Sequence, residues 1–392
     1  MAVEYPVEVC KILKEKFRLA RLYRPMRVER YDPGTELIYD VTGIEKADKA
    51  QLRLFVEKFV GGGYAGQVYK VKLLDIKAEN EPIEALKVGQ IYALKILVPT
   101  STFAKFFRNF LYWLGFQGPF QLQVNPKAAM AGGLWQKFIR RGAKIRFGDE
   151  MTVVDIYGIF VDDKIGSCGE IREWVDGRTW QLEVDDRMDL LKRWLRGKTV
   201  DQQQLGSPEY RAKKQFMADF VKLLHDMGAY EFARQYEWWT CKSQPNCLKR
   251  EGTENNPDAG LVAVDFRAGL ALLPLLPMSP GDFKLIINGF ERGSLVQFDR
   301  GDVDKLQAFI QEHYDDFTGS ETMLEELKEA ERIYRDSVPD ITHNLIRLFR
   351  NRQLWITILN SAVTGWKVRN TIDDNWEQKL RKKNALTLLF YL

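Results

Sequence analysis

Apolar and polar residues alternate along residues 52–98 and again along residues 151–175, which is the period of a β-strand. In the first segment, "LRLFVEKFV" and "GQVYKVKLLDI" are separated by a run of glycines, and "GQIYALKILV" follows after a polar stretch. Glycines between two alternating runs favour a tight hairpin. The pattern therefore predicts antiparallel strands in both segments, with a glycine-rich hairpin in the first.

Other parts of the chain show the three- and four-residue apolar spacing of amphipathic helices. One of these helices is expected to end at Gly228, because glycine is common just after a helix C-terminus. The resulting order is strands, helix, strands and then a mainly helical half, which favours an α+β fold over a single parallel sheet. The expected helices lie at residues 8–24, 102–142, 183–228, 303–315 and 321–336 and in the tail from residue 340.

Composition adds that the chain is globular. Its 392 residues are 45% hydrophobic and 29% charged, enough apolar surface for a packed core and enough length for two lobes. Lysine and arginine number 58 against 54 aspartate and glutamate, a formal net charge of +4. This balance does not by itself predict a polyanionic partner.

Cysteine and histidine are too sparse and too scattered for a zinc site or a disulfide framework. The four cysteines form no C-x-x-C pair, and the chain has three histidines. The N-terminus lacks the pattern of a secretory signal, and no run of about 18 apolar residues occurs. We therefore expect no zinc and a cytoplasmic location, with peripheral membrane association left open.

Four features at separate places in the chain suit phosphate and magnesium chemistry. The glycine hairpin in "KFVGGGYAGQVYKVK" (58–72) would let backbone N–H groups approach phosphate oxygens, and Lys95 lies in a following strand. Asn246 begins one short strand and Asp265 ends another, and their oxygens are ligands that Mg²⁺ accepts. These are the components of a phosphoryl-transfer site. Each also has an ordinary explanation, since Asn246 and Asp265 both suit turns.

With these motifs the sequence resembles the protein kinase-like superfamily over roughly residues 52–320. The resemblance implies a bilobal α+β fold with an antiparallel N-lobe sheet and a mainly helical C-lobe. It also implies ATP under the glycine loop, Lys95 on its α/β-phosphates, and Mg²⁺ held by Asn246 and Asp265. The matching residues are Gly61, Gly63, Gly66 and Val68 of the glycine-rich loop, Ala93 and Lys95 of the lysine strand, Glu173 to Val175 of the hinge, Asn246 of the catalytic loop, and Asp265 with Phe266.

On this resemblance the chain divides into four parts. Residues 1–50 form an N-terminal helical extension, 51–175 the N-lobe, 176–320 the C-lobe, and 321–392 a C-terminal helical extension.

The sequence departs from the family at the catalytic residues. Cys241 occupies the position of the catalytic aspartate, which leaves Glu237 or Glu231 as the expected base. Gln136 occupies the approximate position of the helix glutamate that pairs with the lysine, and a neutral amide cannot form that ion pair. Two hypotheses follow. The chain is an atypical ATP- and Mg²⁺-dependent kinase, or it is a pseudokinase that binds nucleotide and a protein partner without transferring phosphate.

A basic aromatic stretch poses a separate question. Residues 96–148 contain no aspartate or glutamate, and residues 102–146 within them are rich in phenylalanine, tryptophan and tyrosine. One interpretation is a surface for an anionic partner, such as a membrane or nucleic acid. The other is a packed helix whose basic side chains extend to water. The eight basic residues are Lys105, Arg108, Lys127, Lys137, Arg140, Arg141, Lys144 and Arg146.

Overall fold

The computed structural model describes residues 27–46, 48–62, 66–78, 83, 85–103, 105–106, 126–179, 207–233, 236, 246–266, 301–337, 360, 363, 366–367 and 372–382. The helix expected at residues 8–24 lies outside the described residues, as do residues 183–206 of the helical region expected at 183–228 and most of the tail from residue 340. Within the described residues the chain is a mixed α and β structure whose sheets are antiparallel.

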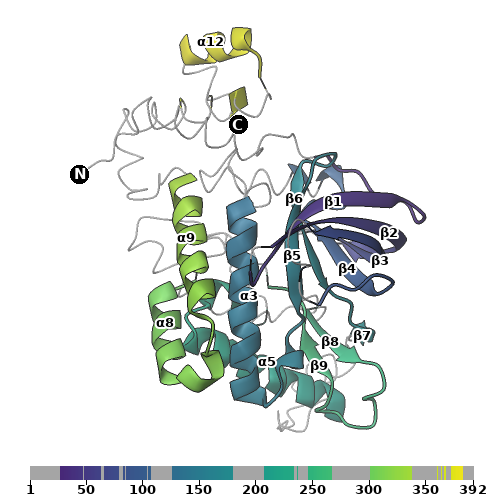
Figure 1. Cartoon of the computed structure of the whole chain (residues 1–392), viewed down its shortest axis with the longest axis vertical. Coiled ribbons are helices and arrows are strands. Elements are labelled where there is room, and N and C mark those ends of the chain that lie inside the picture. Colours follow the sequence, from purple (N-terminus) through teal and green to yellow (C-terminus); the bar gives the residue numbers. More distant parts are fainter. Residues whose placement is uncertain are drawn as a thin grey trace, which may run out of the picture.

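Six strands close into a barrel in the order β1-β2-β3-β4-β6-β5 (Figure 1). They confirm the strands predicted in residues 52–98 and 151–175, and β2 and β3 form the predicted antiparallel hairpin. The bounds are β1 (Glu36–Gly43), β2 (Lys49–Gly62), β3 (Gln67–Ala78), β4 (Ile91–Ile96), β5 (Ile156–Asp162) and β6 (Ser167–Glu173).

The alternation along each strand separates two cores. Every second residue of a strand points into the barrel and fills it, among them Leu94 on β4 and Ile171 on β6. The residues between them point away from the barrel interior, because side chains alternate across a strand. Cys168 of β6 lies on that outer side, in the core that the helices form.

The barrel closes through a strand that the sequence prediction missed. β1 pairs with β5, and the strand lies in the segment assigned to an N-terminal helical extension, so that assignment is wrong for residues 36–43 and 49–50. Leu37 and Tyr39 are buried while Ile38 is 62% exposed, so an outward apolar residue hides the alternation. Closure also depends on Gly158, where an added Cβ would lie 2.5 Å from the Val41 side chain.

Buried polar side chains tie the residues before β1 to the end of the barrel. The hydroxyls of Tyr31 and Tyr39 donate to the Asp162 carboxylate at 2.7 and 2.6 Å. Burial, and then the nearby Asp162 carboxylate, raise the pKa of both tyrosines well above the ordinary value, so both hydroxyls stay protonated donors. Gln67, at the start of β3, is fully buried and donates to the Pro99 carbonyl at 3.1 Å. This network holds the strand that follows the glycine hairpin.

The helices pack around α3 (Pro126–Phe147), which stands beside the barrel in Figure 1. α3 contacts β5 of the barrel as well as α5 and α9. Its Trp135 is fully buried, and the indole N–H donates to Glu331 of α9 at 2.8 Å. The other described helices are α5 (Pro208–Asp226), α6 (Tyr230–Ala233), α8 (Val303–Glu312), α9 (Glu321–Ser337) and α12 (Asp374–Lys382), with short 3-10 helices η2 (Glu150–Thr152) and η5 (Tyr314–Phe317).

Three of these helices confirm predictions from the sequence. α5 begins after Ser207, whose hydroxyl accepts the Tyr210 N–H at 3.1 Å, and it ends just before Gly228 as expected. α8 and α9 cover most of the two helices predicted at residues 303–315 and 321–336. No helix in the described parts of the chain is both long enough and apolar enough to cross a membrane.

A second antiparallel sheet, β7-β8-β9, lies below the barrel in Figure 1. Its strands are β7 (Gly177–Thr179), β8 (Cys247–Arg250) and β9 (Leu261–Ala263). A bridge between Val153 and Ala263 joins β9 to the segment that precedes β5. The ammonium of the buried Lys249 donates to the carbonyl oxygens of Asn256, Pro257 and Ala259, which orders the turn between β8 and β9.

Candidate functional site

Lys95 lies on β4 and points away from the barrel interior. Its neighbours Leu94 and Ile96 fill the barrel, so the alternation places the lysine on the outer face. The Lys95 side chain is 10% exposed. In the sheet it stands opposite Val68 of β3 on one side and Glu170 of β6 on the other.

Asp265 meets Lys95 although the two residues are 170 positions apart. The Lys95 Nζ lies 3.0 Å from Asp265 Oδ1, and the aspartate side chain is 25% exposed. Two contacts anchor the Asp265 segment. The Tyr236 hydroxyl donates to the Asp265 carbonyl at 2.8 Å, and the buried Phe266 ring packs against Phe220. Burial, and secondarily the Asp265 carboxylate, raise the pKa of Tyr236, which keeps its hydroxyl a donor.

Gly66, at the end of the glycine hairpin that leads into β3, lies close to the Lys95 side chain. A Cβ added to Gly66 would lie 2.9 Å from the Ile96 carbonyl oxygen and 3.3 Å from Lys95 Cε, so the backbone approaches the lysine because Gly66 has no side chain. Gly61 has a φ of +153° at the end of β2, and Val68 is partly buried. Gly63 lies outside the described residues.

Asn246 stands beside the Asp265 segment. It immediately precedes β8, and its carbonyl accepts the Val264 N–H at 3.0 Å. The next pair in the ladder is Cys247 with Ala263. The β8–β9 pairing therefore places the two predicted metal ligands at the same end of one sheet.

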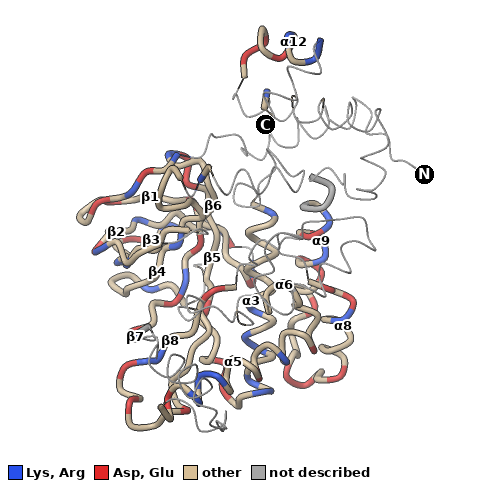
Figure 2. The backbone as a smooth tube through the Cα atoms, turned by 180° about the vertical axis from the view of Figure 1, so that it is seen from behind, with Lys and Arg blue, Asp and Glu red and all other residues tan. Residues whose placement is uncertain are grey.

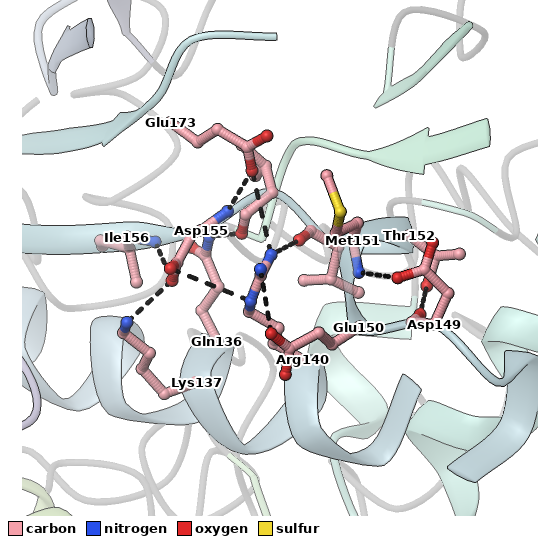
Figure 3. Close-up of polar contacts among 12 residues, drawn as sticks. Gln136, Lys137, Arg140, Asp149, Glu150, Met151, Thr152, Asp155, Ile156 and Glu173 are labelled. Atoms are coloured by element: carbon pink, nitrogen blue, oxygen red, sulfur yellow. Dashed lines mark hydrogen bonds and ion pairs between the residues drawn. The ribbon is translucent and has the colours of Figure 1, made fainter. Parts of the chain in front are cut away.

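Glu173, predicted as part of a hinge, ends β6 inside an ion-pair network (Figure 3). Its carboxylate lies 2.7 Å from Arg250 of β8 and 3.9 Å from Arg140 of α3. Its backbone N–H donates to the Asp155 carbonyl at 3.0 Å. The Glu173 carboxylate thus joins the barrel to α3 and to the second sheet. Val175 is 7% exposed and belongs to the core formed by the helices.

The same network accounts for part of the basic stretch. The Lys137 Nζ lies 2.8 Å from Asp155, and Arg140 donates to the Val153 carbonyl at 2.5 Å (Figure 3). Arg146 pairs with Asp219 of α5 at 2.7 Å. Lys137, Arg140 and Arg146 therefore face partners within the protein, and so does Arg141, which donates to the Thr318 carbonyl at 3.5 Å. The acid-rich helix α9 also lies against α3 (Figure 2). Packing thus explains these residues, and Arg108 falls outside the described residues.

Gln136, at the expected position of the helix glutamate, bonds a backbone carbonyl and not Lys95. Its amide nitrogen donates to the Val154 carbonyl at 2.6 Å, and its side chain is almost completely buried. Gln136 therefore fixes α3 to the segment before β5, and it is Asp265 that contacts Lys95.

Sequence reasoning missed a buried ion pair next to Lys95. Glu170 and Arg172 stand two residues apart on β6, so they share the outer face, and their charged atoms lie 2.5 Å apart. Both are nearly inaccessible to solvent, at 1% and 5% exposure. Arg172 also donates to the Val264 carbonyl at 2.9 Å. The available signal was the pattern Glu-Ile-Arg in a strand next to the Lys95 strand.

The side chains of the two candidate bases, Glu231 and Glu237, lie outside the described residues. The backbone of Glu231 belongs to the short helix α6, whereas the whole of Glu237 is outside the described residues. Among the described residues no three or more histidine, cysteine, aspartate or glutamate side chains form a cluster suited to a metal ion.

Kinase domains of known structure show a distant likeness to this chain. No family model matches the sequence, and no curated protein matches it. A BubR1 kinase domain is similar to this chain at 18% identity with a TM-score of 0.29, covering 67% of this chain and 60% of that one. A rhoptry kinase from Toxoplasma gondii is similar at 10% identity with a TM-score of 0.28, covering 98% and 97%. TM-scores of this size do not establish a shared fold, so the site must be judged on its own geometry.

Proposed function

We propose that this chain is a kinase-like phosphotransferase that uses ATP and Mg²⁺. The observation that carries the proposal is the 3.0 Å contact between Lys95 and Asp265, with the backbone of Gly66 close to the Lys95 side chain. Phosphoryl transfer requires a cation for the phosphates and a carboxylate for the metal ion, and these two side chains supply both. No acceptor for the phosphoryl group is assigned.

In this proposal the two halves of the site come from two lobes. The barrel contributes Gly66 and Lys95, and the β8–β9 hairpin beside the helices contributes Asn246 and Asp265. The Lys95–Asp265 contact joins these halves. The hinge predicted at residues 173–175 connects β6 to β7, where the chain passes from one sheet to the other.

The residues present fit a nucleotide phosphate. Because Gly66 has no Cβ, its backbone lies close to the Lys95 side chain without a clash. Lys95 supplies a positive charge that is largely shielded from solvent. Charge neutralisation is strongest where water is largely excluded. Lys95 would therefore hold phosphate oxygens, while the hairpin with Gly61, Gly63 and Gly66 covers them.

The residues present also fit Mg²⁺. This ion commonly takes one or two protein carboxylates together with substrate phosphates and water, without an all-protein cage. Asp265 provides a partly exposed carboxylate, and Asn246, which immediately precedes β8, provides an amide. When bound, ATP would supply the phosphoryl group and Mg²⁺ would offset its charge. Glu237 or Glu231 remains our proposed acceptor of the hydroxyl proton.

A second candidate function is a nucleotide-binding scaffold that transfers nothing. The observation that favours it is Gln136, whose amide is bonded to the Val154 carbonyl and does not supply a carboxylate for Lys95. A site in which Lys95 is held only by Asp265 would bind nucleotide without being arranged for transfer. The nucleotide-bound form of the protein would then bind a protein partner.

Calorimetric titration with ATP, with and without Mg²⁺, tests nucleotide binding. We expect binding that Mg²⁺ strengthens, that Lys95→Ala weakens in both conditions, and that Asp265→Ala weakens mainly when Mg²⁺ is present. Lys328→Ala, in an exposed pair on α9, is the matched control and should bind like the unmodified protein. A folded protein that binds no ATP would refute both candidate functions.

The same Asp265→Ala variant separates the two candidates. In a phosphotransferase it should abolish conversion of ATP to ADP in single-turnover measurements and abolish function in the host. In a scaffold, function in the host should survive wherever nucleotide binding does. Retained host function with Asp265→Ala would therefore exclude phosphoryl transfer as the role of the protein.

A further inference from the structure

This inference rests on the proposed function, in which Asp265 has two roles. It holds the Lys95 ammonium at 3.0 Å, and it is the carboxylate offered to Mg²⁺. A carboxylate that turns to a divalent ion weakens its hold on the lysine. The Lys95 side chain is only 10% exposed, so water compensates its charge poorly. A second carboxylate within reach would resolve this conflict.

Glu170 is placed to be that carboxylate. It stands directly opposite Lys95 in the β4–β6 ladder. Side chains of directly opposed residues on one face begin about 5 Å apart at Cβ, and both of these side chains are long enough to meet. Glu170 is 1% exposed, so its carboxylate, like the Lys95 ammonium, is largely shielded from water.

Arg172 holds the Glu170 carboxylate in position. The guanidinium lies 2.5 Å from the Glu170 carboxylate, and a buried carboxylate is stable as an ion only when it is paired. A carboxylate has about four lone-pair sites, so Glu170 can accept Arg172 and a lysine ammonium together. Arg172 also bonds the Val264 carbonyl, one residue before Asp265, which connects the pair to the segment that would move.

The geometry points to Glu170 as the positioning residue that receives Lys95 when Asp265 turns to a metal ion. Lys95 moves from Asp265 to the carboxylate across the strand, and its charge stays compensated in both arrangements. The site thereby regains the lysine–carboxylate pair that Gln136 of α3 cannot form. The carboxylate comes from the sheet instead of from a helix.

Asp265→Asn tests the exchange without any nucleotide. A crystal structure of this variant should place the Lys95 Nζ within about 3 Å of the Glu170 carboxylate, a normal hydrogen-bond distance. A lysine that stays beside residue 265, or that turns to solvent while Glu170 contacts only Arg172, would overturn the inference.

A double-mutant cycle provides the same test in solution. Lys95→Met, Glu170→Gln and the double variant are each made in the unmodified protein and in the Asp265→Asn background. Urea unfolding of each gives the coupling between the two positions. We expect coupling between positions 95 and 170 to grow by about tenfold in the unfolding equilibrium constant in the Asp265→Asn background. Equal coupling in both backgrounds would mean that Glu170 serves only to balance Arg172.

ATP titration then links the exchange to the proposed function. Glu170→Gln should weaken binding of ATP with Mg²⁺ by about tenfold, and Glu170→Asp should restore part of it because the carboxylate is retained. Unchanged binding in Glu170→Gln would count against the inference. If the unmodified protein binds no ATP, the proposed function fails, while the Asp265→Asn structure still decides where Lys95 goes.

Discussion

The ammonium of Lys95 and the carboxylate of Asp265 lie 3.0 Å apart, joining the barrel to the segment after β9. Both side chains are mostly shielded from solvent, at 10% and 25% exposure. The pair is therefore a contact between the barrel and the segment after β9 as well as the centre of the proposed site, and the two roles can be tested separately.

The first prediction concerns the stability of this pair. Lys95→Met should lower the free energy of unfolding by about 1 to 3 kcal/mol, because it leaves the Asp265 carboxylate without its ammonium partner. The double variant Lys95→Met/Asp265→Asn should recover part of the loss. Urea denaturation measures both. Lys328→Met, in the exposed α9 pair with Glu325, serves as the control and should cost less than about 0.5 kcal/mol. An equal cost at both sites would contradict the prediction.

The second prediction concerns the approach of the glycine hairpin to Lys95. Gly66→Ala should weaken ATP binding by about tenfold or more, because the new Cβ would press on the Ile96 carbonyl and on Lys95. The matched control is Gly89→Ala, in the turn between β3 and β4. There φ is +87° and the surrounding space is open, so the cost is backbone strain of about 1 kcal/mol away from the site. Equal losses of ATP binding in the two variants would show that general destabilisation is responsible.

The third prediction concerns Glu173 in the network of Figure 3. Glu173→Gln should destabilise the protein by about 1 to 3 kcal/mol, because Arg140 and Arg250 lose a shared carboxylate that is 18% exposed. Glu150→Gln removes another partner of Arg140, but that carboxylate is 49% exposed, and the cost should stay below about 1 kcal/mol. Thermal and urea unfolding measure the difference. Similar costs would mean that the network does not join the two parts of the protein.

The fourth prediction is a pH dependence of stability from the buried Lys213. Burial lowers the pKa of Lys213 from 10.5 to about 7 in the folded chain. Between pH 7 and 9 the unfolded chain therefore holds a proton that the folded chain has released, and this group makes stability rise with pH. Above pH 9 a second group intervenes, because burial raises the pKa of the Cys247 thiol from 9.0 to about 12. Ionisation of Cys247 in the unfolded chain then opposes the gain.

Lys213→Met should flatten this pH dependence. Urea denaturation at pH 7, 8 and 9 should show a slope smaller by up to about 1 kcal/mol per pH unit than in the unmodified protein. It should also show the largest gain in stability at pH 7, where the cost of the buried ammonium is greatest. Lys222→Met, on the exposed side of the same helix, should leave the slope unchanged. An unchanged slope in Lys213→Met would contradict the prediction.

Local sequence patterns account for much of the architecture. The alternation around Leu94 predicts β4, and the glycines after residue 60 predict the hairpin with β3, because both follow from backbone geometry and side-chain periodicity. β1 was missed because its outward Ile38 interrupts the alternation. The expected roles of Lys95, Asn246 and Asp265 come from the resemblance of short motifs, and those roles remain predictions.

By itself the sequence determined the element types and the chemical character of the chain. Its periodicity placed strands and helices, Gly228 marked the end of one helix, the glycines after residue 60 marked a hairpin, and its composition required a packed core. Tertiary structure alone decided which charges meet. Lys95 contacts Asp265 because the segment after β9 reaches the outer face of β4, and Glu170 stands opposite Lys95 because β4 and β6 pair in one register. Arg140 pairs with carboxylates of the protein itself because α3 lies against the segments that carry Asp155 and Glu173. Such pairings depend on long-range packing and solvent exclusion, which no local pattern encodes.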